Sequence, residues 1–161
     1  MSTFHAFIAV LVLCCGYALL RGGACEVIAA ALQLAAYLIG FLMPRLDGPG
    51  GGARVATGFY LIDAALLVCL AVLAIRSTRF WPLWIAGFQT AAVIAHTAKM
   101  LDPTMLAFGY ALQVRGWAYP MLLVMAVGTW RHVRRRRRDG ADPPWKPLGV
   151  RAFKGERGSG R

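Results

Sequence analysis

Residues 57–75 read TGFYLIDAALLVCLAVLAI, and Asp63 is the one charged side chain in this run of 19 residues. A helix needs about 20 apolar residues to cross the hydrocarbon core of a bilayer. Residues 25–43, CEVIAAALQLAAYLIGFLM, form a second apolar run of the same length. Both stretches are therefore predicted to be transmembrane helices.

The composition of the whole chain points the same way. Of its 161 residues, 58% are hydrophobic and 16% are charged. A water-soluble domain of this size needs more polar surface, because much of a small fold stays exposed. We predict an all-α fold, a polytopic transmembrane bundle over residues 1–130. Its five helices are expected at about 4–20, 25–43, 57–75, 81–101 and 104–130.

Helix-breaking residues separate these spans. Gly22-Gly23 ends the first span, and the second stops before Pro44. The segment 45–54, which contains GPGGG at 48–52, is predicted to be a flexible loop and not a stable helix. Asp102-Pro103 is typical of a helix N-terminus. Two of the spans are short for a bilayer, so an alternative with four spans and one re-entrant segment remains open.

Positive charge is concentrated behind the last span. Residues 1–130 hold seven Lys or Arg against four Asp or Glu, whereas residues 131–161 hold eleven against three. A basic segment beside a span stays in the cytoplasm and attracts anionic lipid. We therefore expect a multi-pass protein of a bacterial inner membrane, with its C-terminus in the cytoplasm and its N-terminus outside. The residues expected to contact anionic lipid are Arg131, Arg134, Arg135, Arg136, Arg137 and Arg138.

The tail, residues 131–161, is predicted to be a disordered cytoplasmic segment, because its Gly, Pro and charged residues cannot bury a core. Nucleic acid is not an expected partner. Its binding would require interleaved aromatic residues or a folded basic face, and only Trp145 lies near the basic run. No Lys or Arg precedes the first span, which is interpreted as a retained helix and not as a cleaved signal.

Ionisable side chains inside spans are costly, so they mark either a functional site or a structural ion pair. At a rise of about 1.5 Å per residue, antiparallel spans bring six polar residues toward the outer half of the membrane. Gln89, His96 and Lys99 are spaced by seven and three residues and share one face of the fourth span. Asp63 is the expected partner of that face. The candidate polar cluster comprises Asp63, Gln89, His96, Lys99, Asp102 and Arg115.

This cluster has two interpretations. It forms either an outward-facing cavity, in which Asp63 and His96 titrate and Arg115 holds an anion, or a structural ion-pair network. In the network, Lys99 and Arg115 extend to the outer headgroups. The network is the simpler interpretation.

No catalytic residue, metal site or cofactor is expected. The sequence lacks GxSxG, HExxH and P-loop motifs. Its four cysteines contain no CxxC pair, and they are expected to pack as small apolar residues. His5 and His96 would both lie toward the outer face and could in principle be the axial ligands of a haem. His5, however, is expected to lie in the membrane interface, which argues against a haem site.

Three functions remain open. The first is a structural or accessory subunit that packs against a membrane-protein partner or a second copy through small residues, as at Ala31–Ala35 and Ala36–Gly40. The second is a small transporter or ligand-binding membrane protein that uses the polar cluster. The third is a membrane enzyme or haem carrier.

Overall fold

The computed structural model describes residues 2–47, 52–101 and 107–140 together with Trp145; the side chains of residues 2–4, 46–47, 52–55 and 107–115 are outside this description. The described chain is all-helical and confirms the prediction of five helices. They are α1 (Ser2–Arg21), α2 (Ala24–Asp47), α3 (Gly52–Arg76), α4 (Trp81–Leu101) and α5 (Ala107–Asp139).

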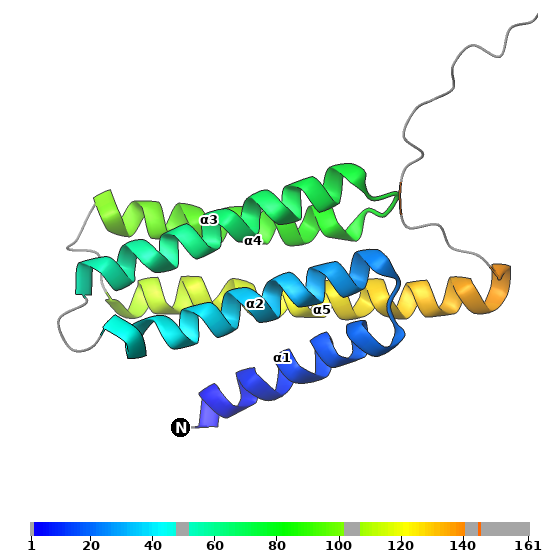
Figure 1. Ribbon diagram of the computed structural model, residues 1–161, viewed down its shortest axis with the longest axis horizontal. Helices are drawn as coiled ribbons and strands as arrows, with labels where there is room; N and C mark the ends of the chain where they lie inside the picture. Colours follow the sequence, from blue (N-terminus) through cyan, green and yellow to red (C-terminus); the bar gives the residue numbers. More distant parts are fainter. Residues whose placement is uncertain (1, 48–51, 102–106, 141–144, 146–161) are drawn as a thin grey trace, which may run out of the picture.

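The helices form an antiparallel bundle (Figure 1). Each helix packs against the next one along the chain, α5 packs back against α1, and α2 also contacts α5. The α1–α2 and α3–α4 turns lie at the same end of the bundle as the C-terminal part of α5. We call this the basic end, because α5 carries its arginine run there.

The last helix is longer than predicted. It was expected to end at Trp130, with residues 131–161 disordered, but α5 continues through the arginine run to Asp139. Arginine is a good helix former, so the run does not end the helix. Gly140 ends it with a φ of 72°, and its N–H donates to the Arg136 carbonyl oxygen over 3.2 Å. Residues 146–161 lie outside the described part of the chain.

The second helix also runs past its expected end, since α2 contains Pro44 and ends at Asp47. The third begins earlier than expected, at Gly52. The prediction of a loop over residues 45–54 was therefore wrong for residues 45–47 and 52–54, which are helical. Arg45 Nη1 donates to the carbonyl oxygen of Phe41 one turn earlier, and its guanidinium lies 3.6 Å from the centre of the Phe41 ring. These contacts hold the chain helical although the proline removes one backbone donor.

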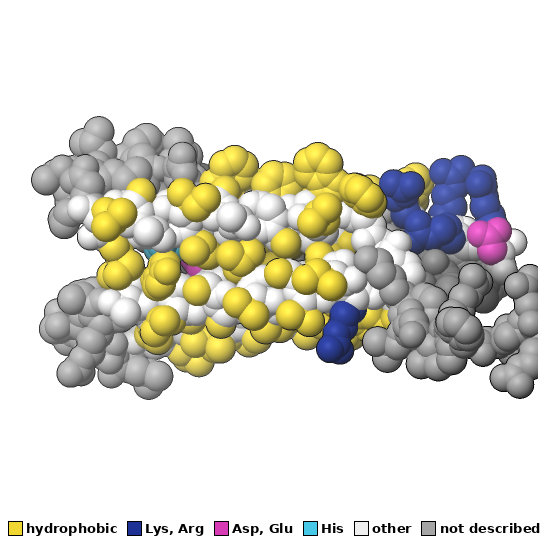
Figure 2. Space-filling model, turned by 90° about the horizontal axis from the view of Figure 1, so that it is seen from above, with side chains coloured by type: hydrophobic (Ala, Val, Ile, Leu, Met, Phe, Trp, Pro, Cys, Tyr) yellow, Lys and Arg dark blue, Asp and Glu magenta, His cyan; other side chains and the backbone are white. Residues whose placement is uncertain are grey.

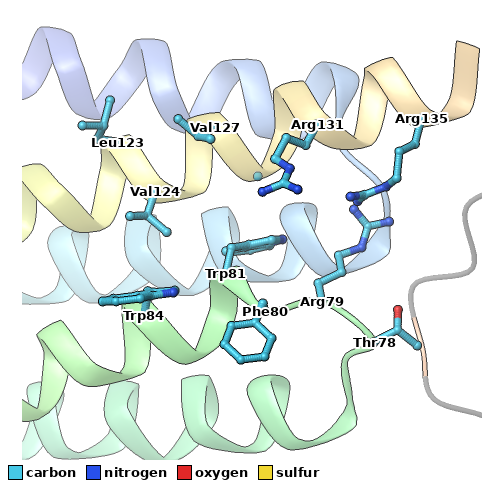
Figure 3. A pocket seen from close by; sticks show the side chains of 11 residues that line it. Thr78, Arg79, Phe80, Trp81, Trp84, Leu123, Val124, Val127, Arg131 and Arg135 are labelled. Atoms are coloured by element: carbon cyan, nitrogen blue, oxygen red, sulfur yellow. The ribbon is translucent and has the colours of Figure 1, made fainter.

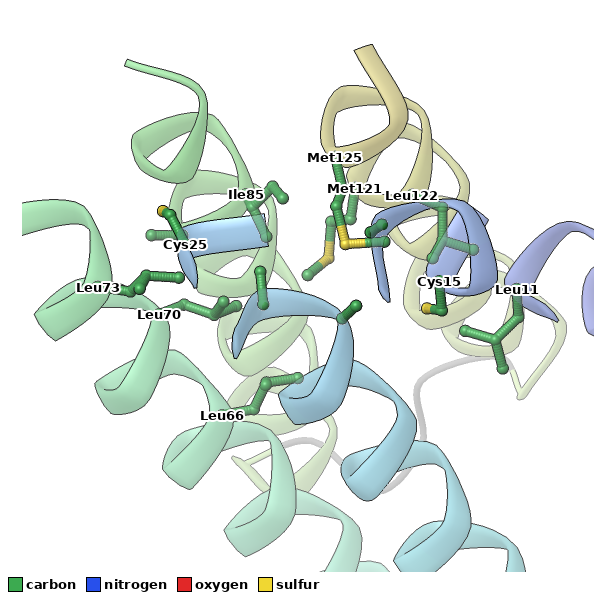
Figure 4. Packing of buried hydrophobic residues seen from close by; sticks show 14 residues of the cluster. Leu11, Cys15, Cys25, Leu66, Leu70, Leu73, Ile85, Met121, Leu122 and Met125 are labelled. Carbon is green, nitrogen blue, oxygen red and sulfur yellow. The ribbon is translucent and has the colours of Figure 1, made fainter. Parts of the chain in front are cut away.

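An apolar core runs between the helices (Figure 4). Leu70 and Ile85, from α3 and α4, are fully buried, as are Leu122 and Met125 of α5. Cys15 and Cys25 are buried in the same core with free thiols, whereas Cys14 is half-buried and Cys69 is exposed. Two of the four cysteines thus lie in the packed interior where they were expected.

The outer surface of the bundle is also apolar. Figure 2 shows hydrophobic side chains along the visible face and arginines gathered at one end. Among the described residues, Ala24–Arg45 and Ala56–Arg76 are long and apolar enough to cross a membrane, and His5–Arg21 is a shorter apolar helix. The large apolar side chains that are at least half exposed are Val12, Leu13, Leu20, Leu38, Ile39, Leu61, Val68, Ile75, Phe80, Leu83, Trp84, Ile94, Met100, Leu101, Leu123 and Trp130.

Helices α4 and α5 approach closely at Gly128. A Cβ atom at this position would lie 2.9 Å from three atoms of the Trp81 ring, which is closer than van der Waals contact allows. These are the ring atoms nearest the Trp81 backbone, so a small side-chain rotation cannot relieve the overlap. Gly128 therefore sets the separation of the two helices at the basic end.

Gly128→Ala is expected to lower the free energy of unfolding by about 1–3 kcal/mol, because the new methyl group overpacks the Trp81 contact. The measurement is thermal unfolding in detergent, followed by circular dichroism. Gly87→Ala is the matched control, since nothing lies within 4 Å of its added Cβ. Equal unfolding midpoints for the two variants would show that the Trp81 contact does not limit the packing.

Candidate functional site

The structure brings three of the predicted cluster residues into direct contact. Gln89 Nε2 donates to Asp63 Oδ1 over 2.9 Å and to the Asp63 carbonyl oxygen over 3.1 Å. His96 Nε2 lies 2.7 Å from Asp63 Oδ2. The His96 side chain is 6% exposed and the Asp63 side chain is 23% exposed, so the carboxylate remains partly accessible. We call these three residues the Asp63 cluster.

The other predicted members are less closely defined. Lys99 lies three residues after His96 on α4 and is half-buried. Arg115 lies in α5, but its side chain is outside the described residues, and Asp102 is outside them altogether. The predicted meeting of all six residues is thus described only for Asp63, Gln89 and His96.

A second buried polar cluster lies at the basic end. Glu26, in the first turn of α2, is completely buried, and its Oε1 accepts a hydrogen bond from Arg79 Nη1 over 2.5 Å. The backbone N–H of Gly23 donates to Oε2 of the same carboxylate over 3.1 Å. A fully buried carboxylate needs such partners, because desolvation of an isolated charge is prohibitive.

Arg79 connects this carboxylate to α5. Its Nη2 lies 2.9 Å from His132 Nδ1, and His132 is buried. A guanidinium has only donors, so His132 Nδ1 is the acceptor of this hydrogen bond. We call Glu26, Arg79 and His132 the Glu26 cluster.

The turn between α3 and α4 directs Arg79 inward. Ser77 is buried, and its Oγ accepts the backbone N–H of Arg79 over 3.0 Å. The Cys25 thiol donates to the same Oγ over 3.5 Å. The hydroxyl thus fixes the local turn and ties it to the start of α2.

Residue 23, in the α1–α2 turn, has no room for a side chain. A Cβ at residue 23 would lie 3.0 Å from His132 Cε1 and 3.3 Å from Glu26 Oε2. The Gly22-Gly23 pair was predicted to end the first span. In the structure it also lets α5 approach the α1–α2 turn.

The Glu26 cluster was not predicted from the sequence. His132 falls in the predicted tail, residues 131–161, and neither Glu26 nor Arg79 was a candidate site residue. One signal was present, because antiparallel spans place residues 21–26, 76–79 and 131–132 at the same end. Glu26 is the single carboxylate among residues 1–46.

Both clusters pair acids with a histidine, but neither gathers the ligands of a metal centre. Among the described residues, no group of three or more His, Cys, Asp or Glu side chains is positioned to hold a metal ion. The interactions within the clusters are ion pairs and hydrogen bonds.

The anionic-lipid residues predicted from the sequence lie on the C-terminal turns of α5. Arg131, Arg134, Arg136, Arg137 and Arg138 are exposed, and Arg135 is half-buried. The Arg134 guanidinium lies 5.5 Å from the centre of the Trp130 ring.

Comparison with known proteins finds no matching family model, no similar curated protein and no similar solved structure.

Arg79→Ala and Glu26→Ala are each expected to lower the free energy of unfolding by about 3–5 kcal/mol, because each leaves a buried charge without its partner. The double variant should lose much less than the sum of the two. Unfolding in detergent measures all three. Arg76→Ala, which removes an exposed arginine three residues away, should stay within about 0.5 kcal/mol of the parent. Additive losses would show that the pair is not coupled.

Proposed function

We propose that this chain is an integral membrane protein with five transmembrane helices and a cytoplasmic C-terminus, and that it acts as a structural or accessory subunit. The proposal depends on one observation, the distribution of the described side chains, which is the reverse of that in a water-soluble protein. Large apolar side chains of all five helices face outward, while Glu26, Arg79, Gln89 and His96 are buried. Such a continuous apolar exterior matches lipid and not water.

The arrangement of α4 supports a membrane span although its average hydropathy is reduced by polar residues. Gln89 and His96 are buried against α3, whereas Leu83, Trp84 and Ile94 are exposed. Gln89 and His96 therefore do not face the lipid. The exposed Thr90 and Thr97 donate their hydroxyl hydrogens to backbone carbonyl oxygens one turn earlier, so these hydroxyls are also satisfied within the helix.

Aromatic residues support the proposed orientation. Phe80, Trp84 and Trp130 are more than half exposed and lie near the basic end, where the helices would enter the headgroup region. Indole rings favour that region, and the arginines of α5 just beyond them favour the cytoplasmic side.

The accessory role is supported by how the polar residues are used. Asp63 accepts a hydrogen bond from Gln89 and lies in contact with His96, and Glu26 accepts a hydrogen bond from Arg79. Both clusters therefore join helices or turns within the bundle. On the outside, Ala31 and Ala35 of α2 are exposed at a spacing that permits close helix contact with another subunit. Gly40, in contrast, packs within the bundle against α3, since a Cβ at this position would lie 3.2 Å from the Phe59 ring.

The membrane part of the proposal is tested by fractionation and reporter fusions. The full-length protein should stay in the membrane pellet after an alkaline wash. A green fluorescent protein fused after residue 161 should fluoresce, and alkaline phosphatase inserted between residues 48 and 51 should be active. Release by the wash, or phosphatase activity only at the C-terminus, would contradict the proposed arrangement.

The accessory role predicts that the tagged protein, extracted from native membranes in mild detergent, runs as an assembly larger than one chain. Ala35→Leu should shift it toward the single chain, because the added bulk separates the packed helices. Ala65→Leu, an equally exposed position on α3, is the control and should leave the assembly intact.

A second candidate function, small-ion transport, is favoured by the partial exposure of the Asp63 carboxylate beside His96. It would replace the accessory role if the extracted protein is a single chain that carries protons into liposomes. In that case Asp63→Asn would abolish the flux and leave the helical content unchanged.

A further inference from the structure

A groove with a volume of about 690 Å³ lies between α4 and α5 at the basic end (Figure 3). One wall comes from the start of α4 and the turn before it, with Phe80, Trp81 and Trp84. The other wall comes from α5. The volume is within the range of about 300–1,000 Å³ that is usual for small-molecule sites.

The α5 wall changes character along its length. Leu123, Val127, Arg131 and Arg135 follow one another at four-residue steps, so they form one stripe along the helix. The residues of the stripe nearer the middle of the bundle, Leu123 and Val127, are aliphatic, and those nearer the basic end, Arg131 and Arg135, are cationic. In Figure 3 the side chains of Arg131 and Arg135 extend from α5 toward the start of α4. The groove is thus amphipathic, and its surface changes from apolar to positively charged along the direction of the helices.

The charge at this end is strongly positive. Residues 131–139 carry six arginines and one acid, Asp139. Arg79 also lines the groove, but its charge is balanced by Glu26. Arg131 and Arg135 therefore add their charges to a field that favours an anion, and two guanidinium groups one helical turn apart suit a phosphate group.

We propose that this groove binds one anionic phospholipid of the cytoplasmic leaflet. The phosphate lies between Arg131 and Arg135, and an acyl chain runs along Leu123 and Val127 against the Trp84 ring. The inference rests on the proposed membrane location. A phospholipid matches both halves of the groove. In the cytoplasmic leaflet its headgroup lies at the basic end and its acyl chains extend toward the middle of the bundle, as the arginines and the aliphatic residues of the stripe do. A soluble anion would leave the apolar half empty, and a lipid without net negative charge would match the positive field of this end less well.

The test uses purified full-length protein in detergent, with phosphatidylglycerol and phosphatidylcholine of identical acyl chains as probes. Native mass spectrometry counts the bound lipids, and a titration gives the affinity. We expect one phosphatidylglycerol per chain. Phosphatidylcholine should bind about tenfold or more weakly, because each nearby arginine contributes about fivefold to the binding of an anionic headgroup.

Two double variants separate the site from general electrostatic attraction. Arg131→Gln/Arg135→Gln should weaken phosphatidylglycerol binding about tenfold or more. Arg134→Gln/Arg138→Gln removes the same charge at the same spacing from residues that do not line the groove. It lowers only the general positive field, so it should weaken the affinity much less than the first double variant does. Circular dichroism verifies that each variant is folded.

A further pair of variants tests the apolar half. Val127→Trp fills the groove and should weaken binding, whereas Val72→Trp is its control on α3. The two valines are 45% and 46% exposed, so the added ring is equally tolerable at both positions.

Several outcomes would overturn the proposal. If inorganic phosphate alone stabilises the protein as much as the lipid does, the groove is a free-anion site and not a lipid site. Equal affinity for the two lipids, or an equal loss in both double variants, would show that no headgroup is recognised here. The reporter fusions test the membrane location separately, so a five-span protein without lipid preference would contradict this inference alone.

Discussion

The Glu26 carboxylate has been removed from solvent, and three chain segments meet where its hydrogen-bond partners lie. The N–H of Gly23 comes from the α1–α2 turn, Arg79 comes from the α3–α4 turn, and Arg79 in turn contacts His132 of α5. A buried carboxylate without these donors would bear most of its desolvation cost. The pairing therefore holds the two turns and α5 in one arrangement at the basic end.

The Asp63 cluster joins α3 to α4 away from this end. Between the two clusters lies an apolar layer that includes Leu70 and Ile85, both completely buried. His96 is 15 residues from Trp81 at the start of α4, which corresponds to roughly 22 Å along the helix. Buried apolar side chains thus separate the two charged groups. This separation is what we expect of a bundle whose helices are joined by polar contacts at two heights. A bundle that conducts ions through its centre would need polar groups between the two clusters.

The Glu26 cluster also shapes the groove that we assign to an anionic lipid. Because Arg79 is held by Glu26, the positive charge offered to an anion comes from Arg131 and Arg135 on the neighbouring helix. The opposite wall is positioned by the contact of Trp81 with the backbone at Gly128. The same interactions that close the bundle at its basic end therefore define a surface complementary to a phospholipid.

The number of helices and most of their limits were determined by the sequence alone, because apolar runs and breakers such as Gly22-Gly23 act locally. The spacing of Gln89 and His96 likewise predicted a shared face, and the structure places Asp63 against it. The partners of Glu26 were decided only by the tertiary structure. Arg79 is 53 residues away in sequence, and such a contact depends on the rotation of each helix about its axis. Helix rotation is set by how all five helices pack together, and no local pattern of residues carries that information.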